Sequence, residues 1–190
     1  MSKTHHPALP GGPFIPETPL ADTDIVLSCK NVWKVFGDRP DQLGPRLTPQ
    51  TTVDDLRATG HIAAVRDVTL DIHKGEMLVV MGLSGSGKST LVRCLARLLD
   101  VTAGTVSVEG RDIGRLSDAE LIELRRSKMG MVFQSFGLLP HRTALENVAF
   151  PLEMRGQDRA SRIARASEML ALVGLKGREG YFPRELSGGQ

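Results

Sequence analysis

Alternating apolar and polar residues predict several β-strands along the chain. The segment 25–37 is rich in β-branched and aromatic residues and ends in glycine, and 65–72 alternates in the way of a half-buried strand. The predominantly apolar stretch 76–81 predicts a buried strand, and shorter strands are expected at 104–110 and 128–134. Because helical segments lie between these strands and no internal repeat is present, we expect an α/β fold.

Helical periodicity and capping signals predict the intervening helices. Leucine and valine residues after Lys88 recur on one face of a helix, as far as position 99. Thr143 is followed three positions later by Glu146, which is the spacing of a capping box. Helices are therefore expected at 52–60, at 88–99, at 117–126, at 143–150 and at 158–173.

Composition and charge exclude several kinds of partner. The formal net charge is +2 and no long run of lysine or arginine occurs, so we expect no nucleic-acid partner. Cys29 and Cys94 lack the spacing of a metal site and are expected to be buried, apolar residues. Apolar runs fall short of the roughly 20 residues of a membrane-spanning helix, so a membrane role is expected to come through a partner. The polar, proline-rich residues 1–24 are expected to form a flexible leader.

The segment after the apolar stretch 76–81 has the sequence pattern that indicates a binding site most clearly. Gly82, Gly87, Lys88 and Ser89 satisfy the phosphate-loop pattern G-x-x-x-x-G-K-S/T between a predicted strand and a predicted helix. Glycines let successive backbone N–H groups turn inward toward phosphate oxygens, and the start of the helix adds a partial positive charge. The alternative is a glycine-rich turn that only caps a helix. The strand–loop–helix context favours a nucleoside triphosphate site.

The residues of this loop have distinct expected roles. Lys88 is expected to reach the β- and γ-phosphates, the Ser89 hydroxyl to ligate Mg²⁺, and Thr90 to bond another phosphate oxygen. The remaining loop positions are expected to contact the phosphates through their backbone. The residues predicted to bind the nucleoside triphosphate at this loop are Gly82, Leu83, Ser84, Gly85, Ser86, Gly87, Lys88, Ser89 and Thr90.

Two later motifs narrow the class of nucleotide-binding protein. Gln134 ends the predicted strand at 128–134, and the stretch LSGGQ occupies Leu186, Ser187, Gly188, Gly189 and Gln190. Together with the phosphate loop, and in this order, they make the chain resemble the ATP-binding subunits of ABC transporters over residues 25–190. The resemblance implies a P-loop α/β core at 65–134, an antiparallel strand layer near the N-terminus with an insertion at 38–64, and a helical subdomain at about 135–190.

The resemblance also assigns roles to residues outside the phosphate loop. Phe36 matches the aromatic position that stacks on adenine, although a core role remains open because Trp33 is nearby. Gln134 matches the glutamine that touches Mg²⁺ or water and senses nucleotide state. LSGGQ matches the signature that contacts the γ-phosphate of ATP on a second, identical subunit, whereas on its own Ser187 could be a plain helix cap.

A finer resemblance points to the importers of quaternary amines. The insertion at 38–64 and the segments 81–98, 117–126 and 131–141 are similar to the glycine betaine/proline branch. This implies import of a compatible solute, with polar amino acids as the alternative substrates. It implies an integral membrane permease as partner, a substrate-binding protein as an indirect one, and a place on the cytoplasmic face of the inner membrane.

The residues with which this family hydrolyses ATP are not found in residues 1–190. An apolar strand ending in a magnesium-binding aspartate, the glutamate after it and a later histidine should follow the signature, and residue 190 is the last of the sequence. We therefore expect no catalytic residue in this chain and negligible ATP hydrolysis by the 190-residue polypeptide, as the N-terminal part of an ATPase. The alternatives are a regulatory module that binds ATP without hydrolysing it and a soluble ABC ATPase of DNA repair or translation.

Overall fold

The computed structural model describes residues 24–133 and 137–190, and the chain divides into two compact units. The first ends at Asp118 and the second covers Ala119–Gln190, and each is described by itself. The predicted leader, apart from Asp24, lies outside the described residues, and so does Gln134. In the part of the chain that the structure describes, no helix combines the length and the apolar character that crossing a bilayer requires.

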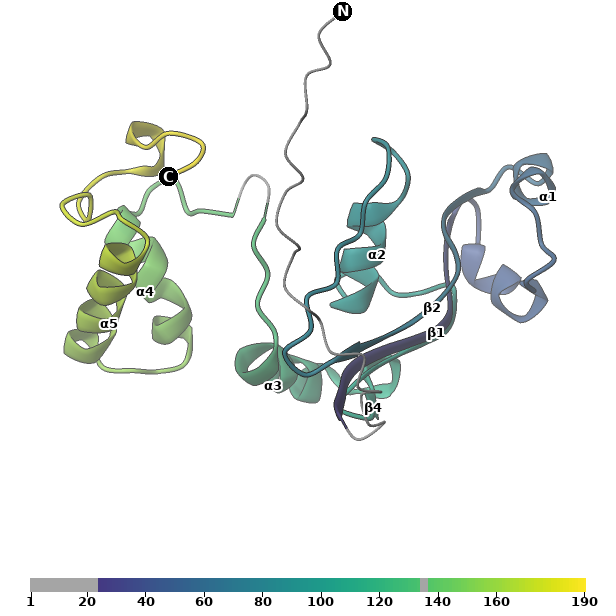
Figure 1. Cartoon of the computed structure of the whole chain (residues 1–190), viewed down its shortest axis with the longest axis horizontal. Helices are drawn as coiled ribbons and strands as arrows, with labels where there is room; N and C mark the ends of the chain where they lie inside the picture. The colour runs from purple at the N-terminus through teal and green to yellow at the C-terminus, as the bar shows by residue number, and fades with distance from the viewer. Residues whose placement is uncertain (1–23, 134–136) are drawn as a thin grey trace, which may run out of the picture. The chain divides into compact units, whose positions relative to one another are not determined.

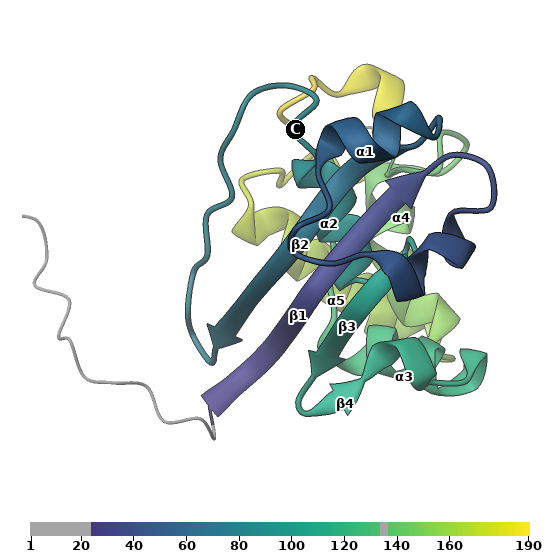
Figure 2. The same ribbon diagram turned by 90° about the vertical axis from the view of Figure 1, so that its right-hand side faces the viewer.

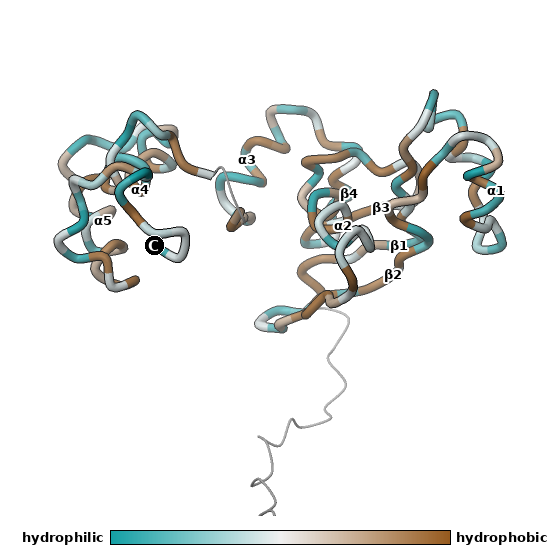
Figure 3. Tube along the Cα trace, turned by 90° about the horizontal axis from the view of Figure 1, so that it is seen from above, coloured by the Kyte–Doolittle hydropathy of each residue, from teal (hydrophilic) through white to brown (hydrophobic). Residues whose placement is uncertain are grey.

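A four-stranded antiparallel sheet forms the centre of the first unit (Figure 1), and its strand order, β2-β1-β3-β4, can be followed in Figure 2. β1 runs from Ile25 to Phe36 and is flanked by β2 (Ile62–His73) and β3 (Ala103–Val108), and β4 is the short edge strand Arg111–Asp112. These strands confirm the predictions at 25–37, 65–72 and 104–110. Both hydrophobic and hydrophilic residues occur along them, as Figure 3 shows.

Short helices complete the first unit (Figure 2). Between β1 and β2 lie the 3-10 helix η2 (Pro40–Arg46) and α1 (Val53–Ala58), and Leu56 of α1 packs with Trp33 and Val35 of β1. α2 (Lys88–Leu95) contacts β1 and β2, and η3 (Ile113–Arg115) follows β4. The helix expected to extend to position 99 stops at Leu95, because Arg97 adopts a left-handed φ of 49° and the N–H of Leu98 turns back to the carbonyl of Arg93.

The second unit is helical. It contains α3 (Asp118–Lys128), which starts at its boundary, α4 (Ala144–Met154), α5 (Arg159–Leu172) and the 3-10 turn η4 (Pro183–Glu185). Ala144, Leu170 and Leu175 form its buried apolar cluster. The predicted capping box is confirmed: the N–H of Thr143 donates to the Glu146 carboxylate at 2.8 Å, and the N–H of Glu146 donates to the Thr143 hydroxyl at 3.3 Å.

Two predicted strands are wrong. Residues 76–81 and 128–133 contain no strand, and Met77, Val79 and Val132 are 87%, 64% and 99% exposed. An apolar run becomes a buried strand only when neighbouring strands take up its N–H and C=O groups on both sides. Among the described residues the sheet consists of β1 to β4 alone, and none of these strands pairs with either segment. The apolar pattern predicted a strand without identifying its neighbours.

Candidate nucleotide-binding site

The loop from Gly82 to Gly87 leads from the irregular segment after β2 into α2. Gly85 and Gly87 have φ values of 79° and 88°, in the left-handed region that disfavours residues with a Cβ. Gly87 is the N-cap of α2, and a Cβ at this position would overlap the carbonyl oxygen of Ala64 on β2. Glycine at position 87 therefore lets the start of α2 lie directly against the sheet.

The Lys88 ammonium lies inside the curve of this loop. Its Nζ donates to the carbonyl oxygens of Gly82 at 2.8 Å and Leu83 at 2.5 Å, and to the Ser86 hydroxyl at 3.3 Å. These acceptors are neutral, so the positive charge of Lys88 remains available for an anion. An anionic oxygen would form stronger, charge-assisted hydrogen bonds with the same ammonium.

The first turn of α2 supplies the remaining donors. Lys88, Ser89 and Thr90 open the helix, where backbone N–H groups have no partner within the helix and carry a partial positive charge. The Ser89 side chain is exposed and that of Thr90 is half-buried. The ammonium and the N–H groups at the helix start can donate to phosphate oxygens, and the hydroxyl oxygen of Ser89 can ligate a Mg²⁺ ion bound to the triphosphate. The residues present therefore fit ATP and magnesium.

A cavity of about 330 Å³ adjoins the loop. It is lined by loop and α2 residues and by apolar residues of β2, including Ser86, Lys88, Val65 and Val68. The end of the phosphate loop and the start of α2 therefore lie beside β2, even though the segment before the loop is not a strand.

Phe36 lies at the end of β1, where it pairs with Ile62 of β2. Its side chain is 40% exposed, and the Lys34 ammonium lies 5.3 Å from the centroid of its ring. Trp33, the alternative aromatic residue, is 2% exposed and belongs to the apolar cluster around Leu56. Of these two aromatic residues, Phe36 is the one whose ring surface is available for stacking.

The signature residues lie in the second unit and form a turn. Leu186 packs against the cluster of Ala144, Leu170 and Leu175. The side-chain oxygen of Gln190 accepts from the N–H of Ser187 at 3.0 Å, and the N–H of Gln190 donates to the carbonyl of Ser187 at 2.9 Å. The residues from Ser187 to Gln190 are exposed. The turn is thus anchored by Leu186 and presents serine and glycine outward.

Asn147 organises the segment before α4 in a way that the sequence did not indicate. Its side-chain oxygen accepts from the N–H of Leu139 at 2.7 Å, and its amide group donates to the carbonyls of Leu139, Arg142 and Thr143 at 3.0 to 3.1 Å. Arg142 also forms an ion pair with Glu153 at 2.8 Å. The half-buried Asn147 side chain thus forms four hydrogen bonds with the backbone of three residues, and only the three-dimensional arrangement reveals this.

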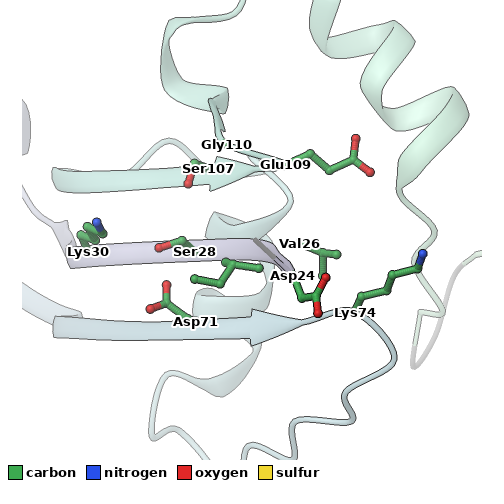
Figure 4. A pocket seen from close by; sticks show the side chains of 10 residues that line it. Asp24, Val26, Ser28, Lys30, Asp71, Lys74, Ser107, Glu109 and Gly110 are labelled. Atoms are coloured by element: carbon green, nitrogen blue, oxygen red, sulfur yellow. The ribbon is translucent and has the colours of Figure 1, made fainter. Parts of the chain in front are cut away.

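A hollow of the first unit that is larger than the cavity beside the phosphate loop lies elsewhere on the sheet. It has a volume of about 820 Å³ and lies over β1, β2 and β3 near the strand ends (Figure 4). Its lining carries both signs of charge, from Asp24, Asp71, Glu109, Lys30 and Lys74. Carboxylates among these side chains oppose an anion, so a triphosphate fits the phosphate loop better.

Neither cysteine belongs to a site in the described residues. Burial raises the pKa of the Cys29 thiol and of the Cys94 thiol, which keeps both in the neutral form. Both thiols are free and buried, as predicted. No group of three or more histidine, cysteine, aspartate or glutamate residues in residues 24–133 and 137–190 could hold a metal ion.

Comparison with known proteins identifies the family. The family model for ABC transporters matches residues 65–190. A solved dimeric ATP-binding cassette bound to ADP and Pi superposes with a TM-score of 0.70 and 35% identity, over 86% of this chain and 64% of that cassette. The chain belongs to the ABC transporter family and has the fold of its ATP-binding cassette. The fold class and the family resemblance expected from the motifs are confirmed.

The curated relatives point to one branch of this family. The trimethylamine N-oxide transport system ATP-binding protein TmoW of Ruegeria pomeroyi is 67% identical over 165 residues, which are 87% of this chain and 48% of that protein. The glycine betaine/proline betaine transport system ATP-binding protein ProV of Escherichia coli is 46% identical over 166 residues, which are 87% of this chain and 42% of that protein. The chain thus spans about half the length of the curated relatives that it matches.

Proposed function

We propose that the protein is the ATP-binding subunit of an ABC importer for a small methylated amine. The observation that carries this proposal is the Lys88 ammonium held inside a glycine loop at the start of α2, in a chain of the ABC transporter family. Lys88 and the N–H groups of α2 bind the triphosphate, the Ser89 hydroxyl ligates Mg²⁺, and Phe36 stacks on adenine. Bound ATP supplies the phosphoanhydride bond whose cleavage powers transport, and in this proposal residues 1–190 provide contacts that bind ATP rather than the residues that hydrolyse it.

The signature turn completes the site of a second copy in this proposal. Its exposed Ser187 hydroxyl and glycine N–H groups are suited to an anion, and Leu186 anchors the turn to the second unit. The solved cassette that shares the fold is dimeric. We therefore assign the signature to the γ-phosphate held by the phosphate loop of the partner copy, and Gln134 to sensing the nucleotide.

The helical unit is the proposed contact with an integral membrane permease. A groove of about 590 Å³ with a mainly apolar lining runs between the first turns of α4 and α5, beside Leu145, Ile163 and Gly180. An apolar groove with a charged edge suits a short amphipathic helix. In this proposal the subunit is peripheral, on the cytoplasmic face of the inner membrane, and it contacts a substrate-binding protein only through the permease.

The substrate class rests on the relatives. TmoW and ProV are named for trimethylamine N-oxide and for glycine betaine and proline betaine, which all carry a methylated nitrogen. A methionine import ATP-binding protein from Mesorhizobium japonicum is 48% identical over 138 residues, which are 73% of this chain. Methylated amines are therefore favoured over amino acids. Uptake of labelled trimethylamine N-oxide and glycine betaine, by cells with and without the intact gene, distinguishes these substrates.

ATP binding is tested by replacing Lys88 with alanine in the intact protein. Charge-assisted hydrogen bonds contribute about 1.5 to 3 kcal/mol, so calorimetry should show a loss of roughly 10- to 100-fold in affinity for magnesium-ATP. Lys74→Ala is the matched control, because Lys74 is an exposed lysine in the turn after β2, outside the phosphate loop. Equal affinities of the Lys88→Ala and Lys74→Ala proteins would contradict the proposed site.

A further inference from the structure

His61 connects the end of α1 to the chain directly after Phe36. Its Nδ1 lies 2.9 Å from the Thr59 hydroxyl, and its Nε2 lies 2.9 Å from the carbonyl oxygen of Asp38. The ring is 9% exposed, although histidine is usually found at intermediate burial. A single buried side chain thus joins two segments 23 positions apart.

The path of the chain after Phe36 depends on this ring. Gly37 has a φ of 148°, and a Cβ at this position would overlap the ring carbons of His61. The backbone therefore passes against the ring edge before Asp38 accepts its hydrogen bond. Removing the ring would therefore remove both its packing against Gly37 and its hydrogen bond to Asp38, directly after the end of β1.

The contacts of His61 with Thr59 and with the Leu56 carbonyl tie it to α1. Leu56 of α1 is 4% exposed and packs with Trp33 and Val35 of β1. The Leu56 carbonyl accepts from the N–H of His61 at 2.8 Å and from the Thr59 hydroxyl at 2.9 Å. The ring is therefore fixed to an apolar cluster on the same sheet that carries Phe36.

Phe36 and the phosphate loop meet the same strand close to His61. Ile62, the residue after His61, is the cross-strand partner of Phe36. Ala64, two residues further along β2, is the point where Gly87 at the start of α2 contacts the sheet. The distance from the aromatic ring to the phosphate loop is therefore set by three consecutive residues of β2 that follow His61.

We propose that His61 is a positioning residue for the nucleotide base, acting through Phe36. The segment 38–64 then serves to fix the angle and depth of the Phe36 ring relative to the phosphate loop, so that base stacking and phosphate binding act on one ATP molecule. This inference rests on the proposed function, since it assigns a role within the same nucleotide site. It adds that the base end of the site is built by a segment outside the phosphate loop.

The test compares two ligands that differ only in having a nucleoside. The affinities of the intact protein for magnesium-ATP and for inorganic tripolyphosphate are measured by calorimetry for the wild type, Phe36→Ala and His61→Ala. Loss of base stacking should lower the ATP affinity of Phe36→Ala by about tenfold. His61→Ala should lower it by about three- to tenfold, while tripolyphosphate affinity stays within about twofold of the wild type in both variants.

Two further variants separate positioning from folding. In His61→Gln the side-chain amide N–H can occupy the position of the histidine Nε2 and donate to the Asp38 carbonyl oxygen. This variant should therefore have an ATP affinity within about threefold of the wild type. His73→Ala removes a histidine from the opposite end of β2, where it contacts Glu76, and should leave both affinities unchanged. A thermal melt shows whether each variant is folded at the temperature of measurement.

The outcomes distinguish this inference from the proposed function. If Lys88→Ala binds tripolyphosphate as tightly as the wild type, the proposed nucleotide site is wrong, and the positioning role of His61 is refuted with it. If Phe36→Ala weakens ATP binding while His61→Ala keeps the wild-type ratio of the two affinities, the nucleotide site stands and the role of His61 is refuted. An equal loss of both affinities in folded His61→Ala also refutes it, because His61 then supports the whole loop.

Discussion

Replacing Gly87 with alanine should separate the conformation of the phosphate loop from its packing on the sheet. Gly85 and Gly87 share a left-handed backbone, with φ values of 79° and 88°. A Cβ at Gly85 would meet nothing within 4 Å, whereas a Cβ at Gly87 would overlap the carbonyl oxygen of Ala64. Gly85→Ala is therefore a matched control that introduces the same conformational penalty without the overlap.

The expected changes in the free energy of unfolding follow from the left-handed conformation and from the overlap with Ala64. A left-handed conformation costs an L-residue roughly 1 to 2 kcal/mol, and the loss of glycine's freedom in the unfolded chain offsets about 0.4 to 1 kcal/mol of that. Gly85→Ala should therefore lower the free energy of unfolding by about 1 kcal/mol. At Gly87 the overlapping atom belongs to the backbone and no side-chain rotation relieves it, so overpacking should add about 1 to 3 kcal/mol.

The assay is urea unfolding of both variants, followed through the fluorescence of Trp33, which is 2% exposed in β1. Magnesium-ATP affinity is measured in parallel, and Gly87→Ala should lose more affinity, because displacing the start of α2 from Ala64 moves Lys88 and its N–H groups. If the two variants have equal free energies of unfolding and equal ATP affinities, then contact between Gly87 and β2 does not hold the loop, and the reasoning is refuted.

Two further predictions concern α1. Leu56→Ala should lower the free energy of unfolding by about 2 to 5 kcal/mol, because Leu56 is 4% exposed against Trp33, whereas exposed Arg57→Ala should change it by less than about 0.5 kcal/mol in the same urea assay. The hydroxyl and the N–H of Thr52 donate to the Asp55 carboxylate and lower its pKa. Because the pKa is lower in the folded state, the charged carboxylate stabilises the fold above the unfolded pKa of about 3.9, and this contribution is lost as pH falls through the folded pKa. The destabilisation caused by Asp55→Asn should therefore be largest near neutral pH and vanish in acid, and a constant difference across a pH series of unfolding curves would contradict the assignment.

Local signals in the sequence predicted the elements whose determinants are themselves local. The capping box at Thr143 and Glu146 formed as its spacing predicted. The backbone N–H of Thr143 lowers the pKa of Glu146, which favours the charged form needed by the cap. β1 was predicted because its residues carry their own β-propensity and end in a glycine turn. The phosphate loop likewise depends on glycines and a lysine within eight positions.

Features that depend on distant residues were missed or misassigned. The segment 76–81 has the apolar composition of a buried strand, but a strand is defined by its hydrogen-bonded neighbours. Its residues are exposed, and the pattern could not show that β1 to β4 pair only among themselves in the described residues. His61 and Asn147 carried no sequence signal, because each acts through carbonyl groups that every residue has.

The two halves of the proposed composite site have separate apolar anchors. Phe36 and the phosphate loop depend on the sheet of the first unit, through the cluster of Trp33 and Leu56 and through the contact of Gly87 with β2. The signature turn depends on Leu186, which packs on the cluster of α4 and α5 in the second unit. A change in one cluster should therefore alter one set of ATP contacts while leaving the other set intact. Such independence suits a site whose two halves come from different copies of the chain, because each half must keep its shape before the copies meet.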